Sequence, residues 1–146
     1  MSTLLSINNL NIEAHTRTGV VQVVKDLSFS IRQGETLGVV GESGCGKTVT
    51  ALSIMKLLPK ETLKISSGNI IFNNKTINNL SDSELEKIRG NEISMIFQEP
   101  MTSLNPLFTV GEQVAEVVRR HKNVSKERGW KRAIELLDLV KIANPE

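Results

Sequence analysis

A glycine-rich octapeptide at residues 41–48 constrains this chain more than any other segment. Its sequence is Gly41-Glu42-Ser43-Gly44-Cys45-Gly46-Lys47-Thr48, which matches G-x-x-x-x-G-K-[ST], the P-loop or Walker A pattern. The apolar residues 36–40 predict a buried strand before it, and the apolar spacing of residues 48–58 predicts a helix that Pro59 ends. A strand that turns sharply into a helix is the context in which this pattern binds phosphate. The segment therefore predicts a nucleotide-binding site.

The residue types in this segment suit a phosphate chain. Its glycines allow a bent backbone whose N–H groups point inward, with no Cβ to block an approaching phosphate. The helix that begins near Lys47 adds unsatisfied N–H groups and the positive end of its dipole. Lys47 would supply charge to the β- and γ-phosphates, and the Thr48 hydroxyl can ligate Mg²⁺. The alternative is a glycine-rich turn with a solvated lysine, which the flanking strand and helix disfavour.

Composition limits the classes of protein that this chain can belong to. Its 146 residues suit one domain of ordinary size, and the 39% hydrophobic and 23% charged residues lie in the globular range. A net charge of +2 gives no electrostatic reason to expect nucleic acid as a partner. The single cysteine excludes an internal disulfide and fits a reducing compartment. The first residues lack a signal-peptide layout, and no apolar run approaches the ~20 residues of a membrane span.

Strands are predicted mainly in the first two thirds of the chain. Alternating or continuous apolar runs predict them at residues 4–13, 20–24, 27–31, 68–72 and 93–97. The first three are expected to be antiparallel and half buried, with Leu5, Ile7, Leu10 and Ile12 inward. Turns are expected at residues 15–19, at Gln33-Gly34 and at the hairpin pair Asn73-Asn74, and a loop at residues 60–67.

Helices are predicted mainly in the last third. Capping boxes, in which a serine or threonine is followed three residues later by a glutamate, mark two helix starts. These helices are expected at residues 82–89, after Ser81, and from Thr109 to about His121. Ser125 can cap a last helix, whose apolar residues recur at helical spacing. Strands first and helices last predict two subdomains.

Three features together resemble one protein family. They are the P-loop GESGCGKT, the apolar strand that ends in Gln98, and the run QEPMTSLNP at residues 98–106. With these features the chain resembles the ATP-binding subunits of ABC transporters, in which the glutamine belongs to the Q-loop. EPMTSLNP, the opening LLSINNLNIE and the segment VVKDLSFSIRQGE are similar to the branch that powers dipeptide, oligopeptide and nickel importers. The resemblance covers essentially the whole chain.

The resemblance implies a fold and a set of site residues. The fold is α/β, with a P-loop NTPase core and an antiparallel β subdomain in residues 1–109 and the start of a helical subdomain in residues 110–146. Thr48 and Gln98 would hold Mg²⁺, and Gln98 would also approach the attacking water, because a neutral amide can both donate and accept. Lys47 and Gln98 are thus the catalytic candidates. The residues that would cradle ATP are Gly41, Ser43, Gly44, Cys45, Gly46, Lys47 and Thr48.

Two of these candidate residues, Gln98 and His15, can also be interpreted without a role in nucleotide binding. Without the resemblance, Gln98 is a polar residue that ends a strand. The family usually stacks an aromatic ring on adenine just after the first strand, where this chain has Ala14 followed by His15. The His15 ring has a π-face and can stack on the base, or it can be a solvated loop histidine, and the sequence leaves both open.

Hydrolysis in this family needs more than a P-loop. The acidic strand end that polarises the water, the LSGGQ-like signature and the switch histidine do not occur in these 146 residues. The only apolar run that ends in aspartate, residues 133–138, has the spacing of a helix face. We therefore expect an incomplete ABC ATPase domain, truncated before the signature, which binds nucleotide but hydrolyses little by itself.

The resemblance also implies partners and a location. The subunit would pair with a second ATP-binding subunit and meet transmembrane permease subunits through the Q-loop region. It would lie at the cytoplasmic face of the cell membrane and couple MgATP to uptake of peptides or nickel. A GTPase or small-molecule kinase is one alternative, although Asn74-Lys75-Thr76-Ile77 lacks the aspartate of the guanine motif N-K-x-D. A non-transport ABC-type ATPase or another P-loop nucleotide-binding module is the other.

Overall fold

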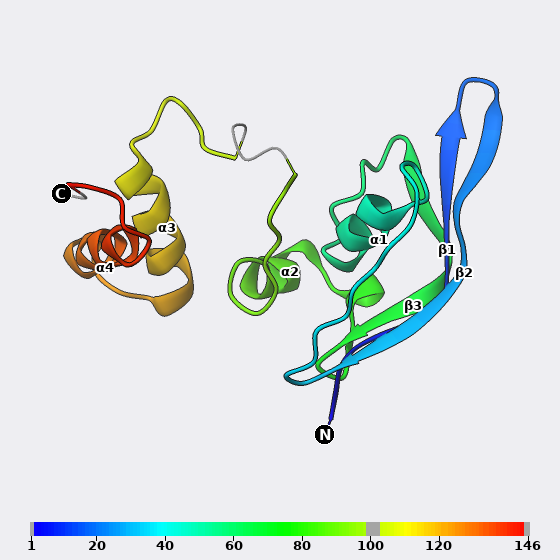
Figure 1. The fold of residues 1–146 in the computed structure, drawn as a ribbon, viewed down its shortest axis with the longest axis horizontal. Helices are drawn as coiled ribbons and strands as arrows, with labels where there is room; N and C mark the ends of the chain where they lie inside the picture. Colours follow the sequence, from blue (N-terminus) through cyan, green and yellow to red (C-terminus); the bar gives the residue numbers. More distant parts are fainter. Residues whose placement is uncertain (1, 99–102, 145–146) are drawn as a thin grey trace. The chain divides into compact units, whose positions relative to one another are not determined.

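In the computed structural model, residues 2–98 and 103–144 are described. The chain divides into two units, Met1–Leu85 and Glu86–Glu146, and Figure 1 shows its ribbon. The elements, in chain order, are β1 (Thr3–Thr16), β2 (Gly19–Arg32), α1 (Lys47–Ile54), β3 (Leu63–Phe72), β4 (Lys75–Thr76), the 3-10 helix η1 (Ile77–Asn79), α2 (Asp82–Ile88), α3 (Val110–Lys122) and α4 (Lys126–Leu139).

An antiparallel four-stranded sheet, in the order β2-β1-β3-β4, dominates the first unit. The predicted inward residues of β1 are buried, and Leu10 and Ile12 are fully inaccessible. Strict alternation would place Leu10 on the opposite face from Ile7, because successive strand residues point to opposite faces. An extra residue at Asn8–Asn9, where the register with β2 shifts, returns Leu10 to the buried face. β2 follows a curved path beside β1 (Figure 1).

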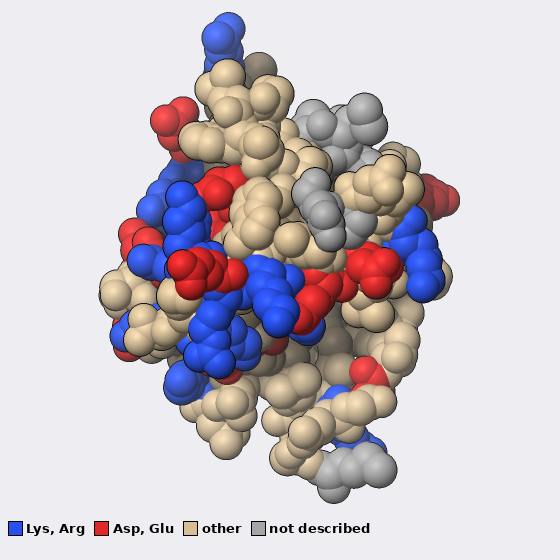
Figure 2. Space-filling view, turned by 90° about the vertical axis from the view of Figure 1, so that its left-hand side faces the viewer, with Lys and Arg blue, Asp and Glu red and all other residues tan. Residues whose placement is uncertain are grey.

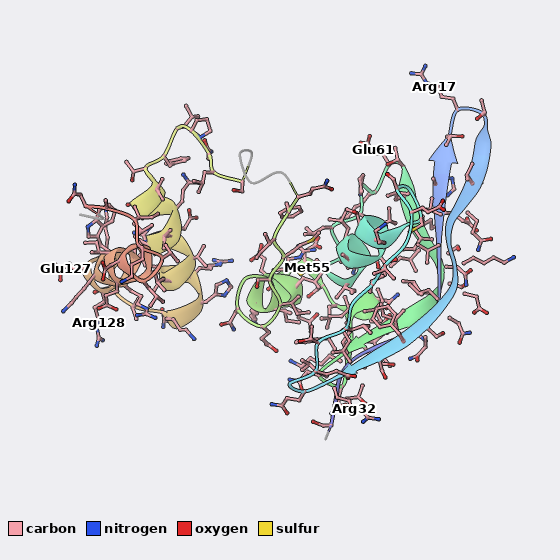
Figure 3. All side chains as sticks on the ribbon, in the orientation of Figure 1. Arg17, Arg32, Met55, Glu61, Glu127 and Arg128 are labelled. Carbon is pink, nitrogen blue, oxygen red and sulfur yellow. The ribbon has the colours of Figure 1, made fainter. Side chains whose placement is uncertain are left out.

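Two tight turns close the hairpins of the sheet. Arg17 lies at the tip of the β1–β2 hairpin and projects away from the strands (Figure 3). Asn73 and Asn74, with φ of 47° and 62°, join β3 to β4. Asparagine tolerates this left-handed region, so the predicted hairpin turn is confirmed. The capping box of α2 is also confirmed, because Ser81 N donates to Glu84 Oε2 at 2.8 Å and Glu84 N donates to Ser81 Oγ at 3.4 Å.

The second unit contains a close pair of helices, α3 and α4. Thr109 Oγ1 accepts from Glu112 N and Ser125 Oγ accepts from Arg128 N, so both predicted caps are confirmed. The helices approach closely at small residues, since a Cβ on Gly129 would lie 2.7 Å from Arg119 Cγ. Small residues at a helix crossing shorten the distance between the axes, and they account for the tight pairing.

Two predicted strands are wrong in this structure. Residues 36–40 form no strand, and Val40 is 94% exposed. Residues 93–97 form only a single bridge, between Arg89 and Ile93, and Ile96 is 95% exposed. An apolar run indicates that a segment is suited to burial, but a strand also needs a neighbour that pairs with its backbone. Within the described residues, 36–40 has no such neighbour and 93–97 pairs only at the single bridge of Ile93 with Arg89.

Three boundaries also differ from the predictions. The loop expected at residues 60–67 belongs largely to β3, which starts at Leu63 because residues 11–14 of β1 provide a pairing partner. The turn expected at residues 15–19 is shorter, since β1 runs to Thr16. Helix α1 ends at Ile54, four residues before the expected end. Lys56, two residues further on, has a left-handed φ of 52°, which is incompatible with a continuing right-handed helix. Among the helices that the structure describes, none is both long and apolar enough to cross a bilayer.

Candidate functional site

The glycine-rich segment forms the turn that leads into α1. Gly44 and Gly46 both have left-handed φ angles, 83° and 91°. Residues other than glycine rarely adopt such angles, because their Cβ atom clashes with the backbone. Helix α1 starts at Lys47, directly after Gly46 as N-cap. The sharp turn and the helix start predicted from the motif are therefore confirmed, although the strand before them is not.

At two glycines an added side chain would crowd a neighbouring group. A Cβ on Gly41 would lie 2.6 Å from Cys45 Sγ, and a Cβ on Gly46 would lie 3.0 Å from the Val23 carbonyl oxygen and 3.1 Å from Val24 Cγ2. β2 is thus in direct contact with the helix start. Sequence reasoning missed this contact, because residues 20–24 carry only the β-branched pattern of a strand.

The start of α1 carries no competing cap. Gly46 provides no side-chain hydrogen bond, and the first turn contains no acidic residue. The buried Thr50 and Ser53 hydroxyls instead donate to carbonyl oxygens inside the helix, Gly46 O at 2.9 Å and Thr50 O at 2.6 Å. The first amides therefore keep their hydrogen-bonding capacity and partial positive charge, which favours an anion at this end.

The Lys47 side chain folds back over the same turn. Its ammonium group donates to the carbonyl oxygens of Gly41 and Glu42, both at 2.7 Å, and lies 3.5 Å from Cys45 Sγ. One cation, one helix start and an exposed thiol thus converge on a single loop. An ammonium held among carbonyl oxygens can exchange these partners for phosphate oxygens, which bind it more strongly because they are charged.

The candidate magnesium ligands lie in different units. The Thr48 side chain is exposed in the first turn of α1, and Gln98 is exposed after residues 93–97, in the second unit. The predicted Q-loop residues 99–102 lie outside the described residues. Across the part of the chain that the structure covers, no group of three or more His, Cys, Asp or Glu residues could hold a metal ion.

His15 lies at the C-terminal end of β1, next to its last residue Thr16. Its backbone N–H donates to Thr62 O at 2.8 Å, which ties this end of the hairpin to the loop before β3. The residue is exposed. In the described residues its ring forms no hydrogen bond or ion pair, so both explanations of His15 stay open.

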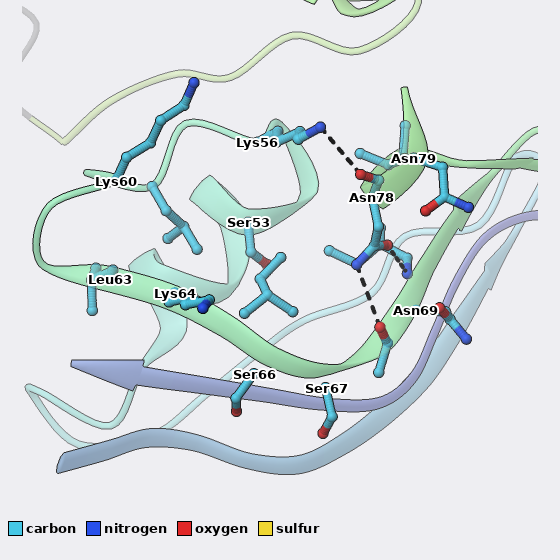
Figure 4. Close-up of a pocket in the computed structure, with 15 residues that line it drawn as sticks. Ser53, Lys56, Lys60, Leu63, Lys64, Ser66, Ser67, Asn69, Asn78 and Asn79 are labelled. Carbon is cyan, nitrogen blue, oxygen red and sulfur yellow. Dashed lines mark hydrogen bonds between the residues drawn. The ribbon is translucent and has the colours of Figure 1, made fainter. Parts of the chain in front are cut away.

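A hollow of about 710 Å³ lies in the first unit between the end of α1, β3 and η1 (Figure 4). Lys56 reaches across it, and its ammonium donates to Asn78 O at 3.1 Å and Leu80 O at 2.8 Å. The Asn78 amide in turn accepts from Ile70 N at 2.8 Å, at the edge of β3. These bonds join η1 to the sheet, and the hollow shares no residue with the glycine-rich turn.

Charged side chains of both signs lie close together on the one face that Figure 2 shows. On the face shown in Figure 2, Lys and Arg side chains lie interleaved with Asp and Glu. Ion pairs such as Arg119–Glu112 at 2.9 Å and Arg132–Glu135 at 2.8 Å join opposite charges in the second unit.

The geometry fits a nucleotide phosphate chain. Left-handed glycines, an uncapped helix start and an ammonium group are brought together within residues 41–48. This combination is a ready site for a multiply charged anion. Glycine is favoured at position 46, where φ is 91° and a Cβ would crowd the Val23 carbonyl oxygen at 3.0 Å, whereas a Cβ at Gly41 would only have to displace the Cys45 side chain.

Comparison with known proteins gives a consistent result. The family model described as ABC transporter matches residues 24–145. The chain is 50% identical over 145 residues to the dipeptide transport ATP-binding protein DppD of Bacillus subtilis, covering 99% of this chain and 43% of the relative. It is 48% identical over 143 residues to the oligopeptide transport ATP-binding protein OppD of the same organism, covering 98% and 40%. The chain thus spans well under half the length of these curated relatives.

A solved structure has the same fold. It is the dimeric structure of a post-hydrolysis state of the ATP-binding cassette MJ0796, bound to ADP and Pi. The TM-score is 0.78 at 26% sequence identity, covering 97% of this chain and 59% of the other. The expected fold class, an α/β ABC ATPase domain with an antiparallel β subdomain, is confirmed for the part of the cassette that this chain covers.

Proposed function

This chain belongs to the ABC transporter family, and we propose that it is the nucleotide-binding part of the ATP-binding subunit of an importer. Its relatives of 48–50% identity are dipeptide and oligopeptide transport ATP-binding proteins. The observation that carries the proposal is the convergence of Lys47 on an uncapped helix start behind left-handed glycines. The cargo would be peptides or, by the branch resemblance, nickel.

Each residue of the turn is proposed to bind a different part of MgATP. The amides of residues 41–48 and the first turn of α1 receive the phosphate oxygens, and Lys47 neutralises the β- and γ-phosphates. Thr48 supplies a hydroxyl ligand to Mg²⁺, and Gln98 supplies an amide ligand and orients water. When bound, Mg²⁺ neutralises charge on the phosphate oxygens. His15 is the candidate for stacking on adenine.

Coupling to transport would need partners. One structural neighbour is a dimer of ATP-binding cassettes, and we extend this assembly to a second ATP-binding subunit here. Permease subunits would contact the region that starts at Gln98, which places the protein peripherally at the cytoplasmic face of the membrane. The boundary between core and helical subdomain is proposed at residues 109 and 110, just before the Thr109-capped helix α3.

Full activity is proposed for the whole protein rather than for residues 1–146. The acidic strand end, the LSGGQ-like signature and the switch histidine that the family uses for hydrolysis do not occur in residues 1–146. Residues 1–146 alone would therefore bind nucleotide and turn it over slowly. The alternative proposal, a non-transport ABC-type ATPase, rests on the same turn and differs only in its partners.

Two experiments test the proposal. Tagged protein is captured from detergent-solubilised cells, and co-purifying permease subunits support an importer, whereas capture of soluble partners alone supports the non-transport alternative. Competition between ATP and GTP for the site separates an ABC ATPase from a GTPase. Displacement of ATP by GTP at a much lower concentration than ATP itself requires would favour the GTPase, and failure of ATP to bind at all would contradict the ATP-binding function.

A further inference from the structure

Three neighbouring strands are irregular at the same level of the sheet. Asn9 in β1 and Asp26 in β2 have left-handed φ angles of 47° and 48°, and Gly68 in β3 has a φ of 92°. The pairing registers of β1 with β2 and with β3 both shift here. A Cβ on Gly68 would lie 2.4 Å from Asn9 O and 2.6 Å from Leu10 Cα, so the strands approach unusually closely. Bulges of this kind bend a strand and redirect its groups.

The side-chain amide of Asn11 connects all three strands at this level. Its Nδ2 donates to Asn9 O in its own strand and to Ser67 Oγ in β3, both at 3.0 Å. Its Oδ1 accepts from Gln22 Nε2 at 2.7 Å and from Asp26 N at 3.0 Å, both in β2. Two donors and two acceptor positions are the full capacity of a primary amide. The Asn11 amide is therefore saturated by protein groups.

The two β2 partners of Asn11 bracket the residues that contact the glycine-rich turn. Gln22 precedes, and Asp26 follows, the pair Val23–Val24. Val24 is paired with Ile12 and Gln22 with Glu13, which leaves Val23 as an extra, unpaired residue of β2. The carbonyl oxygen of this bulged residue is the group that would lie 3.0 Å from a Cβ on Gly46. Asn11 thus holds the two flanks of the bulge that supports the start of α1.

We propose that Asn11 is a positioning residue for the nucleotide site, acting through the Val23 bulge on Gly46. The proposal rests on the proposed function in so far as the site binds ATP. Without the Asn11 amide, Gln22 and Asp26 lose a common anchor, and the bulge can relax toward a regular register. The Val23 carbonyl then moves away from Gly46, and the left-handed N-cap loses the surface that fixes it. The amides of the turn would no longer converge on one phosphate position.

The test compares Asn11→Ala with Gln22→Ala and with the control Ile70→Val. Ile70 is buried in the same sheet and has no part in the Asn11 network, so its variant reports general loss of stability. MgATP affinity is measured well below the melting temperature of every variant. We expect Asn11→Ala to raise the Kd for MgATP about tenfold. This is the lower end of the loss of affinity found when residues that orient the ligands of a bound metal are removed. Gln22→Ala, which removes one of the four bonds, should have a smaller effect in the same direction, and Ile70→Val should bind like the parent.

A second measurement does not depend on ATP. Cys45 is the only cysteine of the chain and is exposed beside Lys47, so its rate of labelling by a thiol reagent reports the geometry of the turn. Asn11→Ala and Gln22→Ala should change this rate several-fold, and Ile70→Val should not. Parent-like labelling and affinity in Gln22→Ala would overturn the proposal even where Asn11→Ala fails to fold, and so would effects no larger than those of Ile70→Val. Absence of ATP binding in the parent would instead contradict the proposed function, while the labelling rates would still decide the role of Asn11.

Discussion

The ammonium nitrogen of Lys47 lies 2.7 Å from the carbonyl oxygen of Gly41, the first residue of the same glycine-rich turn. The lysine therefore closes the loop on itself, with Glu42 O as a second acceptor at 2.7 Å. Both acceptors are neutral backbone groups. Phosphate oxygens would be stronger partners for the ammonium, because they carry negative charge and add Coulomb attraction to the hydrogen bond.

Replacement of this lysine should weaken nucleotide binding directly. We expect Lys47→Ala to raise the Kd for MgATP about tenfold or more, which corresponds to at least ~1.4 kcal/mol. Titration calorimetry or displacement of a fluorescent nucleotide measures the change. Lys75→Ala removes an exposed lysine of β4 and is the matched control. Equal affinities in Lys47→Ala and the parent would contradict the site.

Substitutions at the two left-handed glycines separate the cost of the backbone conformation from the cost of crowding a neighbouring residue. Gly44 has nothing within 4 Å of an added Cβ, whereas Gly46 has Val23 O at 3.0 Å and Val24 Cγ2 at 3.1 Å. Gly44→Ala should lower the free energy of unfolding by about 1–2 kcal/mol, the cost of a left-handed alanine. Gly46→Ala should cost a further ~1 kcal/mol or more, because crowding adds to the backbone penalty. Urea denaturation measures both, and equal losses would show that β2 does not press on the helix start.

Local chemistry explains which parts of this fold follow from sequence. The caps at Ser81, Thr109 and Ser125 and the asparagine turn after β3 are formed by residues close together in the chain. Their energetics depend on few distant groups, so short patterns predict them. The turn into α1 belongs to the same class, since left-handed glycines and a helix start are properties of one octapeptide.

Features that depend on distant partners were not predictable in the same way. Residues 36–40 have the composition of a buried strand, yet pairing requires another segment to supply hydrogen bonds, and none of the described residues does so. The polar start of β3 is a strand only because β1 lies beside it. The bulge at Val23 and its contact with Gly46 arise from the register of β1 with β2, which no local pattern in residues 20–24 encodes.

The exposed thiol of Cys45 provides a chemical test of the site. Its sulfur lies 3.5 Å from Lys47 Nζ, so an alkyl group attached there would occupy the space that phosphates need. We expect full alkylation to abolish MgATP binding and MgATP to protect the thiol. Cys45→Ser keeps a small side chain, and it should bind ATP and resist the reagent. Unchanged affinity after complete alkylation of the parent would refute the assignment of this turn to phosphate.

Ligand-induced stabilisation tests whether the turn is a competent site in the folded protein. A ligand that binds only the native state should raise its stability by ~2.7 kcal/mol at about 100 times its Kd. The melting temperature should therefore rise steadily with MgATP concentration in the parent. Lys47→Ala should shift the curve to about tenfold higher concentrations without changing its form, because the helix start and the glycine turn remain. Ile70→Val should start from a lower melting temperature and show the parent's concentration dependence. A melting temperature that stays flat in the parent would mean that Gly41, Gly46 and Lys47 form a structural turn, and the nucleotide function would then have to be abandoned for this segment.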